Sequence, residues 1–291
     1  MNPLNWSMRR VKAVAGTGVA IVAIVATTFF VVQLGSETKP KAPFPAPGSV
    51  VNVGLMTDLP GWSFFEASSN VRSGFQYDFM GWLANEMDFK AVPVDVTFEQ
   101  RIPAVQDGRI QVMLANLAIT DERRKQVTFA GPYMINEQSV LTRKSGVRVR
   151  KPEEMASKTV CSMPGTTSLE ILDKRLGGKI NIVLRPGLAQ CVDELRAGRV
   201  DAVSTAHLNL VGFAQEDRNL RLEGFHFGEQ DRFGIGLRLG DLQSCELFRK
   251  KLRDFLTSGA WDVFFKKYFP NEPPAHHKPD PNNLQPCVPP G

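Results

Sequence analysis

The chain has 291 residues, of which 43% are hydrophobic and 22% are charged, proportions typical of a globular protein. They exclude a collagen-like or wholly disordered chain. The formal net charge is only +5 and the basic residues are scattered, so the composition does not indicate a nucleic-acid-binding protein.

The first element in chain order is an uncharged segment. Residues 13–34 contain no charged side chain, and a helix of that length crosses the roughly 30 Å hydrocarbon core of a bilayer. Basic residues precede it, which keeps an N-terminus in the cytoplasm. We therefore expect a cytoplasmic N-terminus at 1–12, a transmembrane anchor or signal segment at 13–35, and an extracytoplasmic remainder. A cleaved signal peptide would make the protein secreted, but no A-x-A-like cleavage triplet follows residues 29–32.

Proline-rich segments flank the central part of the chain. Residues 36–49 contain four prolines, which predicts a semi-extended linker, and residues 270–291 contain eight of the 20 prolines. Between them, short apolar runs alternate with helix-like stretches, a pattern typical of an α/β protein. The stretches 76–89 and 244–256 each place aromatic residues on one helical face, which we assign to the core.

The cysteines fit an oxidising, extracytoplasmic compartment. Four cysteines allow three pairings. Pairing Cys161 with Cys191 and Cys245 with Cys287 closes two loops of a few tens of residues, and the second bridge would hold down the proline-rich tail. No C-x-x-C or histidine spacing supports a metal site, and we expect neither a metal nor a cofactor.

Two segments 90 residues apart share one pattern. Residues 101–120 and 190–209 each read as a helix, a Gly-Arg-aliphatic turn and a strand. Such a repeat is also common in single-lobed α/β proteins. It suggests two lobes whose strand ends face one cleft, where open α/β sheets bind ligands.

Several motifs occur in the order of a known family. They lie at residues 74–78, 101–109, 118–123, 129–133, 165–167, 198–202 and 234–236. Together they resemble the family 3 extracytoplasmic solute-binding proteins, the polar amino-acid receptors of ABC importers. The resemblance covers about residues 50–269, and the placement of Cys161 and Cys191 is similar to that of actinobacterial glutamate-binding members.

The resemblance implies an α/β, two-lobed type II periplasmic-binding-protein fold with two crossover strands. We expect the crossovers near 141–147 and 233–237. Lobe 1 would then comprise 50–145 and 234–269, lobe 2 would comprise 146–233, and 270–291 would be the tail. Both disulfide pairings considered above would stay within a lobe and leave hinge closure free.

The resemblance also assigns candidate ligand-binding residues. Arg123 matches the arginine that holds the ligand's α-carboxylate, and an arginine fork binds carboxylates bidentately. Thr166 and Thr167 precede a helical run and suit the same carboxylate, although a helix N-cap is the alternative. Trp62 and Phe64 match aromatic positions over the ligand, with core packing as the alternative. The full set of candidates is Arg123, Thr166, Thr167, Trp62, Phe64, Asn116 and Asp58.

Two positions depart from the family pattern. Ala206 stands where the family has its ammonium-binding aspartate, and Ala118 replaces a small hydroxyl residue. A buried ammonium left unpaired costs about 3–5 kcal/mol. Either another carboxylate supplies the charge, or the ligand has no amine, or the chain no longer binds solutes. The carboxylates considered are Asp58, Glu66, Glu229 and Asp231.

Three classes of function follow. The first is a receptor that closes on an amino acid such as glutamate or glutamine, or a related carboxylate, and delivers it to an ABC permease in the membrane. The second is a membrane-anchored sensory or scaffold domain of the same fold. The third is a dehydratase of cyclic carboxylates, with His207 and Glu229 as acid–base candidates; because no catalytic motif supports it, we expect no enzyme.

Overall fold

A computed structural model describes residues 44–289. The expected cytoplasmic segment 1–12, the anchor or signal segment 13–35 and the first part of the linker lie outside the described residues. Within residues 44–289, no helix combines the length and the apolar character needed to cross a membrane.

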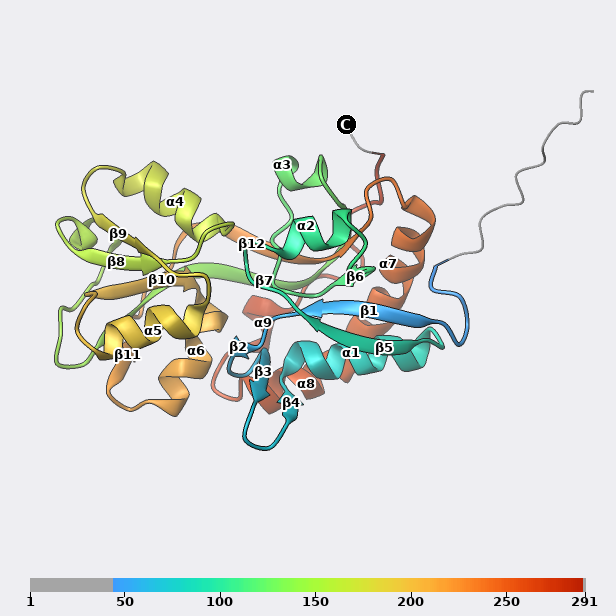
Figure 1. Ribbon diagram of the computed structural model, residues 1–291, viewed down its shortest axis with the longest axis horizontal. Helices are drawn as coiled ribbons and strands as arrows, with labels where there is room; N and C mark the ends of the chain where they lie inside the picture. Colours follow the sequence, from blue (N-terminus) through green and yellow to red (C-terminus); the bar gives the residue numbers. More distant parts are fainter. Residues whose placement is uncertain (1–43, 290–291) are drawn as a thin grey trace, which may run out of the picture. The chain divides into compact units, whose positions relative to one another are not determined.

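The described part of the chain forms a nine-stranded mixed sheet and a small three-stranded sheet (Figure 1). In spatial order the large sheet contains β5 (Lys90–Asp95), β1 (Val50–Leu55), β6 (Val112–Met113), β12 (Phe227–Leu237), β7 (Thr128–Arg143), β10 (Ala202–Ala206), β8 (Thr159–Ser162) and β9 (Asn181–Leu184), and β11 (Leu220–Leu222) pairs with β7. The small sheet contains β2 (Asp58–Leu59), β3 (Ser63–Glu66) and β4 (Val71–Ser73).

Helices cover these strands. They are α1 (Phe75–Glu86), α2 (Arg101–Gln106), α3 (Asp121–Arg124), α4 (Thr167–Leu176), α5 (Leu188–Arg196), α6 (His207–Glu216), α7 (Leu242–Thr257), α8 (Ala260–Tyr268), α9 (Pro274–His277) and the 3-10 turn η1 (Pro152–Met155).

Two long strands join the halves of the large sheet. The 16-residue β7 pairs with β12 along its first part, from Thr128 to Gln138, and with β10 along its second part, from Gln138 to Thr142. We use lobe 1 for β1–β6, α1–α3, α7 and α8, and lobe 2 for η1, β8–β11 and α4–α6. The α/β, two-lobed fold expected from the sequence is present; the exact lobe boundaries stay a prediction. The expected crossover segments, 141–147 and 233–237, overlap the ends of β7 and β12.

Aromatic side chains fill the core of lobe 1. Phe79 of α1 stacks on Phe255 of α7, with ring centroids 4.3 Å apart, and Trp261 of α8 stacks on Phe265. All four are fully buried, and each burial contributes about 1.5–3 kcal/mol. The helical faces predicted at 76–89 and 244–256 are therefore core faces, which confirms that assignment.

Two disulfides are formed, with the pairing considered from the loop lengths. Cys161–Cys191 joins β8 to α5 within lobe 2, and Cys245–Cys287 joins α7 to the tail. Their loops of 30 and 42 residues correspond to roughly 3.5–4 kcal/mol each in the chain-entropy estimate. The second bridge fixes a segment that has little core of its own.

The tail also contacts lobe 2 through histidines. The Nε2 atom of His207, at the start of α6, lies 3.0 Å from the carboxylate of Glu272, and that of His277 lies 3.8 Å from it. The rings of His207 and His226 lie 4.6 Å apart. The hydrogen bond to His207 and the proximity of His277 lower the pKa of Glu272 to about 2. All four histidines of the chain gather here, since His276 neighbours His277.

We predict that Glu272→Gln lowers the free energy of unfolding at pH 7 by about 1–2 kcal/mol, because it removes a charged hydrogen-bond acceptor. The folded-state pKa of Glu272 lies below its usual 4.5. Glu272 therefore contributes fully to the stability of the fold above pH 4.5, and this contribution is lost as the pH falls towards 2. Urea unfolding of both proteins between pH 3 and 7 measures the difference. The control, Glu246→Gln, removes an exposed pair with Arg249 and should have little effect. Equal stability of Glu272→Gln and wild type at pH 7 would contradict the prediction.

Candidate functional site

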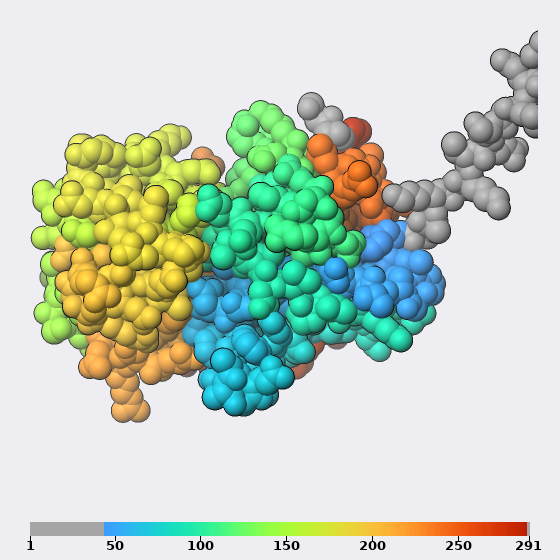
Figure 2. Space-filling view, in the orientation of Figure 1, coloured from blue at the N-terminus to red at the C-terminus, as the bar shows by residue number. Residues whose placement is uncertain are grey.

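A small chamber lies between the lobes. Its volume is about 10 Å³, room for about one water molecule. In the space-filling view, lobe 2 (yellow to orange) lies directly against lobe 1 (blue to teal) (Figure 2). The residues that line it are Phe98, Arg101, Asn116, Arg123, Thr166, Thr167, Ser168, Thr205, Ala206, Asn209, Asp231 and Phe233.

Arg123 lies at this chamber, on the short helix α3. The side chain of Thr120 caps the helix by accepting from the backbone N–H of Arg123. The buried guanidinium donates to the carbonyl of Ala118 at 3.0 Å and to that of Gly165 at 3.1 Å. Burial lowers its pKa. Since a guanidinium has five N–H donors, Arg123 retains donors for a carboxylate.

Arg101 is a second chamber arginine, and we did not select it from the sequence. It is 1% exposed. Its guanidinium donates to the carbonyls of Ala115, Asn116 and Gly165 at 3.0, 2.7 and 2.7 Å, and its Nε donates to Phe98. Burial, and next the charge of Arg123, lower its pKa. One feature of the sequence could have identified it: Arg101 begins a helical turn, residues 101–105, whose other residues are apolar.

Gly165 brings its carbonyl to both arginines. Its φ of +72° is in the left-handed region, which glycine adopts without strain. A Cβ at this position would lie 3.1 Å from the Cα of Glu99 and from the carbonyl of Phe98, in lobe 1. The lobes therefore approach each other here by backbone contact, and a side chain at position 165 would force the facing backbone to shift.

The two threonines that follow Gly165 have different partners. Thr166 caps α4, since its hydroxyl accepts from the N–H of Leu169 and donates to the carbonyl of Met163 at 2.7 Å. The hydroxyl of Thr167 donates to the carboxylate of Asp231, at 2.9 and 3.2 Å from its two oxygens. Thr166 thus has the N-cap role that was the alternative, and Thr167 connects lobe 2 to the crossover strand β12.

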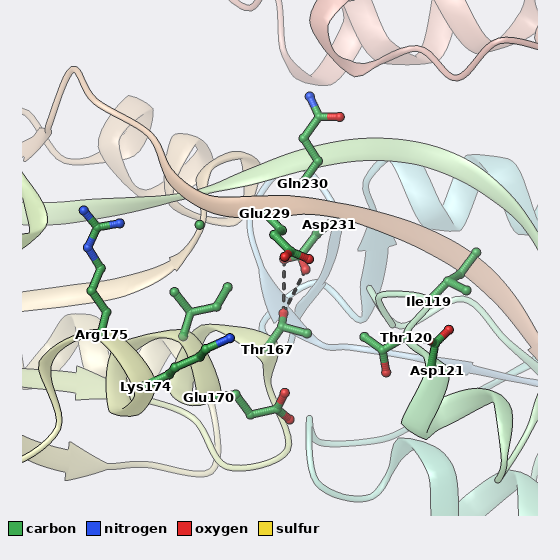
Figure 3. A pocket seen from close by; sticks show the side chains of 12 residues that line it. Ile119, Thr120, Asp121, Thr167, Glu170, Lys174, Arg175, Glu229, Gln230 and Asp231 are labelled. Carbon is green, nitrogen blue, oxygen red and sulfur yellow. Dashed lines mark hydrogen bonds between the residues drawn. The ribbon is translucent and has the colours of Figure 1, made fainter.

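Asp231 is buried at the chamber. Its carboxylate lies beside the hydroxyl of Thr167 (Figure 3). Besides Thr167, the amide of Gln138 on β7 donates to it at 2.5 Å. The other end of that amide accepts from Ser168 at 2.5 Å. Burial raises the pKa of Asp231 to about 6, against the lowering effects of Thr167 and Arg123.

Asn116 connects the lobes on another side of the chamber. Its φ of 51° is unusual for a non-glycine residue. Its amide donates to Asn209 of α6 at 2.8 Å, and its oxygen accepts from Gln76 at 2.5 Å. The Asn116 carbonyl is one of those held by Arg101, so Arg101 fixes the loop that presents this side chain.

Three sequence candidates lie away from the chamber. Trp62 is fully buried and packs on Phe75, Phe233 and Phe269, so it forms part of the core behind the chamber wall. Phe64 is half-buried on the β2–β3 hairpin. The aromatic residues that line the chamber are instead Phe98 and Phe233.

Asp58 is the third sequence candidate that lies away from the chamber, and it contributes to a contact between the lobes. Its carboxylate accepts from the N–H of Ala189 at 3.2 Å, at the start of α5 in lobe 2. Burial raises its pKa. It lines a separate depression of about 220 Å³ and not the chamber.

The departures from the family pattern fall at the chamber. Ala206 ends β10 and lines the chamber, and the carbonyl of Ala118 accepts from Arg123. Of the four carboxylates considered above, Asp231 lines the chamber, whereas Glu66 and Glu229 are exposed.

A wider groove of about 700 Å³ adjoins the chamber (Figure 3). It shares Thr167 and Asp231 with the chamber, and α4, β12 and the start of α3 form its walls. Glu229 lies here, and His207 pairs with Glu272; neither lines the chamber. Among residues 44–289, no group of three or more His, Cys, Asp or Glu side chains is arranged to hold a metal ion.

The comparisons with known proteins agree with one another. The model for bacterial extracellular solute-binding proteins, family 3, matches residues 51–271. The chain is 28% identical over 225 residues to the ABC transporter glutamine-binding protein GlnH of Bacillus subtilis (strain 168), covering 76% of this chain and 81% of that protein. It is 25% identical over 228 residues to the glutamate-binding protein GluB of Corynebacterium efficiens, covering 74% and 76%. Among solved structures, an ancestral arginine-binding protein bound to arginine has a TM-score of 0.71 at 26% identity, covering 76% of this chain and 98% of that one.

We predict that Gly165→Ala weakens the closed contact between the lobes, because the added Cβ would lie 3.1 Å from the backbone of the opposite lobe, which would have to shift. A larger fraction of the molecules should then be open, and small-angle X-ray scattering should give a larger radius of gyration than wild type. Gly178→Ala is the matched control: Gly178 has the same φ of +72°, but nothing lies within 4 Å of a Cβ there. In both variants the left-handed alanine is strained, which costs about 1 kcal/mol of stability. A radius of gyration for Gly165→Ala equal to that of Gly178→Ala would refute the role of this contact.

Proposed function

The chain belongs to family 3 of the bacterial extracellular solute-binding proteins, and we propose that it captures an amino acid between its lobes and delivers it to an ABC importer. The observation that carries this proposal is Arg123, a buried arginine at an interlobe chamber with N–H donors still free. A planar guanidinium in a desolvated site binds a carboxylate strongly and in one orientation.

The relatives support an amino acid as the ligand. The names of those compared above specify glutamine, glutamate and arginine. These three compounds differ in their side chains and share an α-carboxylate and an α-ammonium. We propose that the α-carboxylate lies on Arg123, and we take glutamine, glutamate and arginine as the first ligands to test.

Binding requires the lobes to move. The chamber of about 10 Å³ is far smaller than the roughly 300–1,000 Å³ of pockets that hold small molecules. The Gly165 carbonyl also takes a donor of Arg123 that points across the cleft. We propose that the lobes separate to admit the amino acid and then close with its carboxylate beside Arg123. Hinge closure of this kind is general among periplasmic binding proteins.

The location follows from the family and the sequence. Family membership supports an extracytoplasmic protein, and the two disulfides fit an oxidising compartment. We propose that residues 13–35 either anchor the protein in the membrane with its N-terminus inside or are cleaved as a signal segment, because residues 13–34 are uncharged and follow basic residues. An anchored receptor would stay near its permease.

A second candidate function has one observation in its favour. The lobes are bridged by their own groups, through Gly165 with both arginines and through Asn116 with Asn209. A domain that closes on itself suits a membrane-anchored sensory or scaffold role. The relatives compared above are named for amino-acid binding and not for catalysis, so an enzyme is not proposed.

We predict that Arg123→Ala weakens amino-acid binding at least 100-fold, because removing one partner of a desolvated charge pair costs about 3–5 kcal/mol. Isothermal titration of the full-length protein with L-glutamine, L-glutamate and L-arginine measures this loss. Lys125→Ala is the control, since Lys125 is exposed and its salt bridge within residues 44–289 is to Glu122. If none of these amino acids binds to folded wild-type protein, the sensory or scaffold function replaces the receptor.

A further inference from the structure

Asp231 is a buried carboxylate at the chamber without an ionic partner. It is 6% exposed and accepts hydrogen bonds from Thr167 and Gln138, both neutral. Within residues 44–289, no side-chain nitrogen of Lys, Arg or His lies within 4.0 Å of its carboxylate oxygens. Neutral donors only partly offset the cost of removing a carboxylate from water, so this side chain is suited to meet a cation.

The nearby arginines donate their hydrogen bonds to backbone carbonyls and not to Asp231. Arg101 sends its donors to four backbone carbonyls, and the contacts of Arg123 are the carbonyls of Ala118 and Gly165. Both arginines attract Asp231 through space without contacting it. The chamber therefore presents a carboxylate and a guanidinium that are separate, as a zwitterion requires.

We propose that Asp231 binds the α-ammonium of the ligand and so replaces the aspartate that the position of Ala206 lacks. The amine site thereby moves from the end of β10 to the crossover strand β12. The ligands are then α-amino acids and not carboxylates without an amine. This inference rests on the proposed function, because it assumes that a ligand carboxylate lies on Arg123.

The position of Asp231 would couple binding of the ligand amine to closure of the lobes. Asp231 lies on a strand that joins the lobes, and its carboxylate is held by Thr167 at the start of α4 in lobe 2. Arg123 belongs to lobe 1. A zwitterion between them would neutralise one charge from lobe 1 and one from the crossover strand. The binding site would be complete only when Arg123 and Asp231 face the same chamber.

The protonation of Asp231 provides an independent readout. Burial raises its pKa to about 6. The charged groups near it are Arg101 and Arg123 from lobe 1, Asp121 on α3, Glu229 on its own strand, and Glu170, Lys174 and Arg175 on α4. An ammonium favours the ionised carboxylate, so binding at pH 6 should release a proton and affinity should fall as the pH drops below about 6.

The test compares each amino acid with its counterpart that lacks only the α-amine. Full-length wild type and Asp231→Asn are titrated with L-glutamine, L-glutamate and L-arginine, and with glutaramate, glutarate and 5-guanidinopentanoate. Asparagine keeps the shape and the hydrogen bond to Thr167 and removes the charge. Glu229→Gln is the matched control, an exposed carboxylate two residues away on the same strand. Melting temperatures verify that every variant is folded.

We expect wild type and Glu229→Gln to bind an amino acid about 10- to 100-fold more tightly than its deamino counterpart, as a charged hydrogen bond implies. Asp231→Asn should bind both members of the pair about equally and release no proton at pH 6. If Asp231→Asn keeps the preference for the amine, or wild type has no such preference, the inference is wrong while the receptor function stands. If no probe binds to folded wild type, the proposed function and this inference both fail.

Discussion

The carbonyl oxygen of Gly165 determines how the lobes meet. It accepts hydrogen bonds from Arg101 at 2.7 Å and from Arg123 at 3.1 Å, both from the opposite lobe. A carbonyl oxygen has two lone pairs, so the two guanidiniums saturate it. The left-handed φ of Gly165 and its close approach to the backbone at residues 98–99 disfavour any side chain at this position. The small size of the chamber is a direct result.

Buried charge explains why these groups are arranged in this way. Arg101 and Arg123 both lie out of water, and each buried guanidinium needs acceptors for its donors. Arg101 obtains them from the loop at residues 115–116, and in doing so holds Asn116 in a conformation from which it reaches Asn209. Arg101 is thus a positioning residue. Arg123 has fewer protein partners, and this difference makes it the better carboxylate site.

The sequence predicted those features that depend on local pattern. The aromatic faces of α1 and α7, the two-lobed α/β fold and the chamber positions of Arg123, Thr166, Thr167 and Asn116 could be read from periodicity and from family motifs. Four cysteines allow three pairings, and the pairing considered from the sequence, Cys161 with Cys191 and Cys245 with Cys287, is the one formed. Arg101 and Phe233 were not selected as site residues, and Asp231 was considered only as one of four possible carboxylates, because their burial arises from contacts between segments far apart in the chain. Asp231 in particular lies in a polar run, residues 228–232, that resembles a surface turn. Trp62 reads as a ligand contact by motif, yet its neighbours Phe75 and Phe269 place it in the core.

A ligand carboxylate on Arg123 needs more room than the chamber of about 10 Å³ offers, so the ligand-bound cleft should be wider than the direct contact between the lobes. The most direct measurement is the distance between spin labels at Lys174 on α4 and Glu122 on α3, two exposed positions in opposite lobes. Pulsed electron spin resonance of the full-length protein would be recorded alone and with L-glutamine, L-glutamate or L-arginine. A bound amino acid should give a single distance longer than the shortest population of the protein alone. A bound distance equal to or shorter than that population would contradict this prediction.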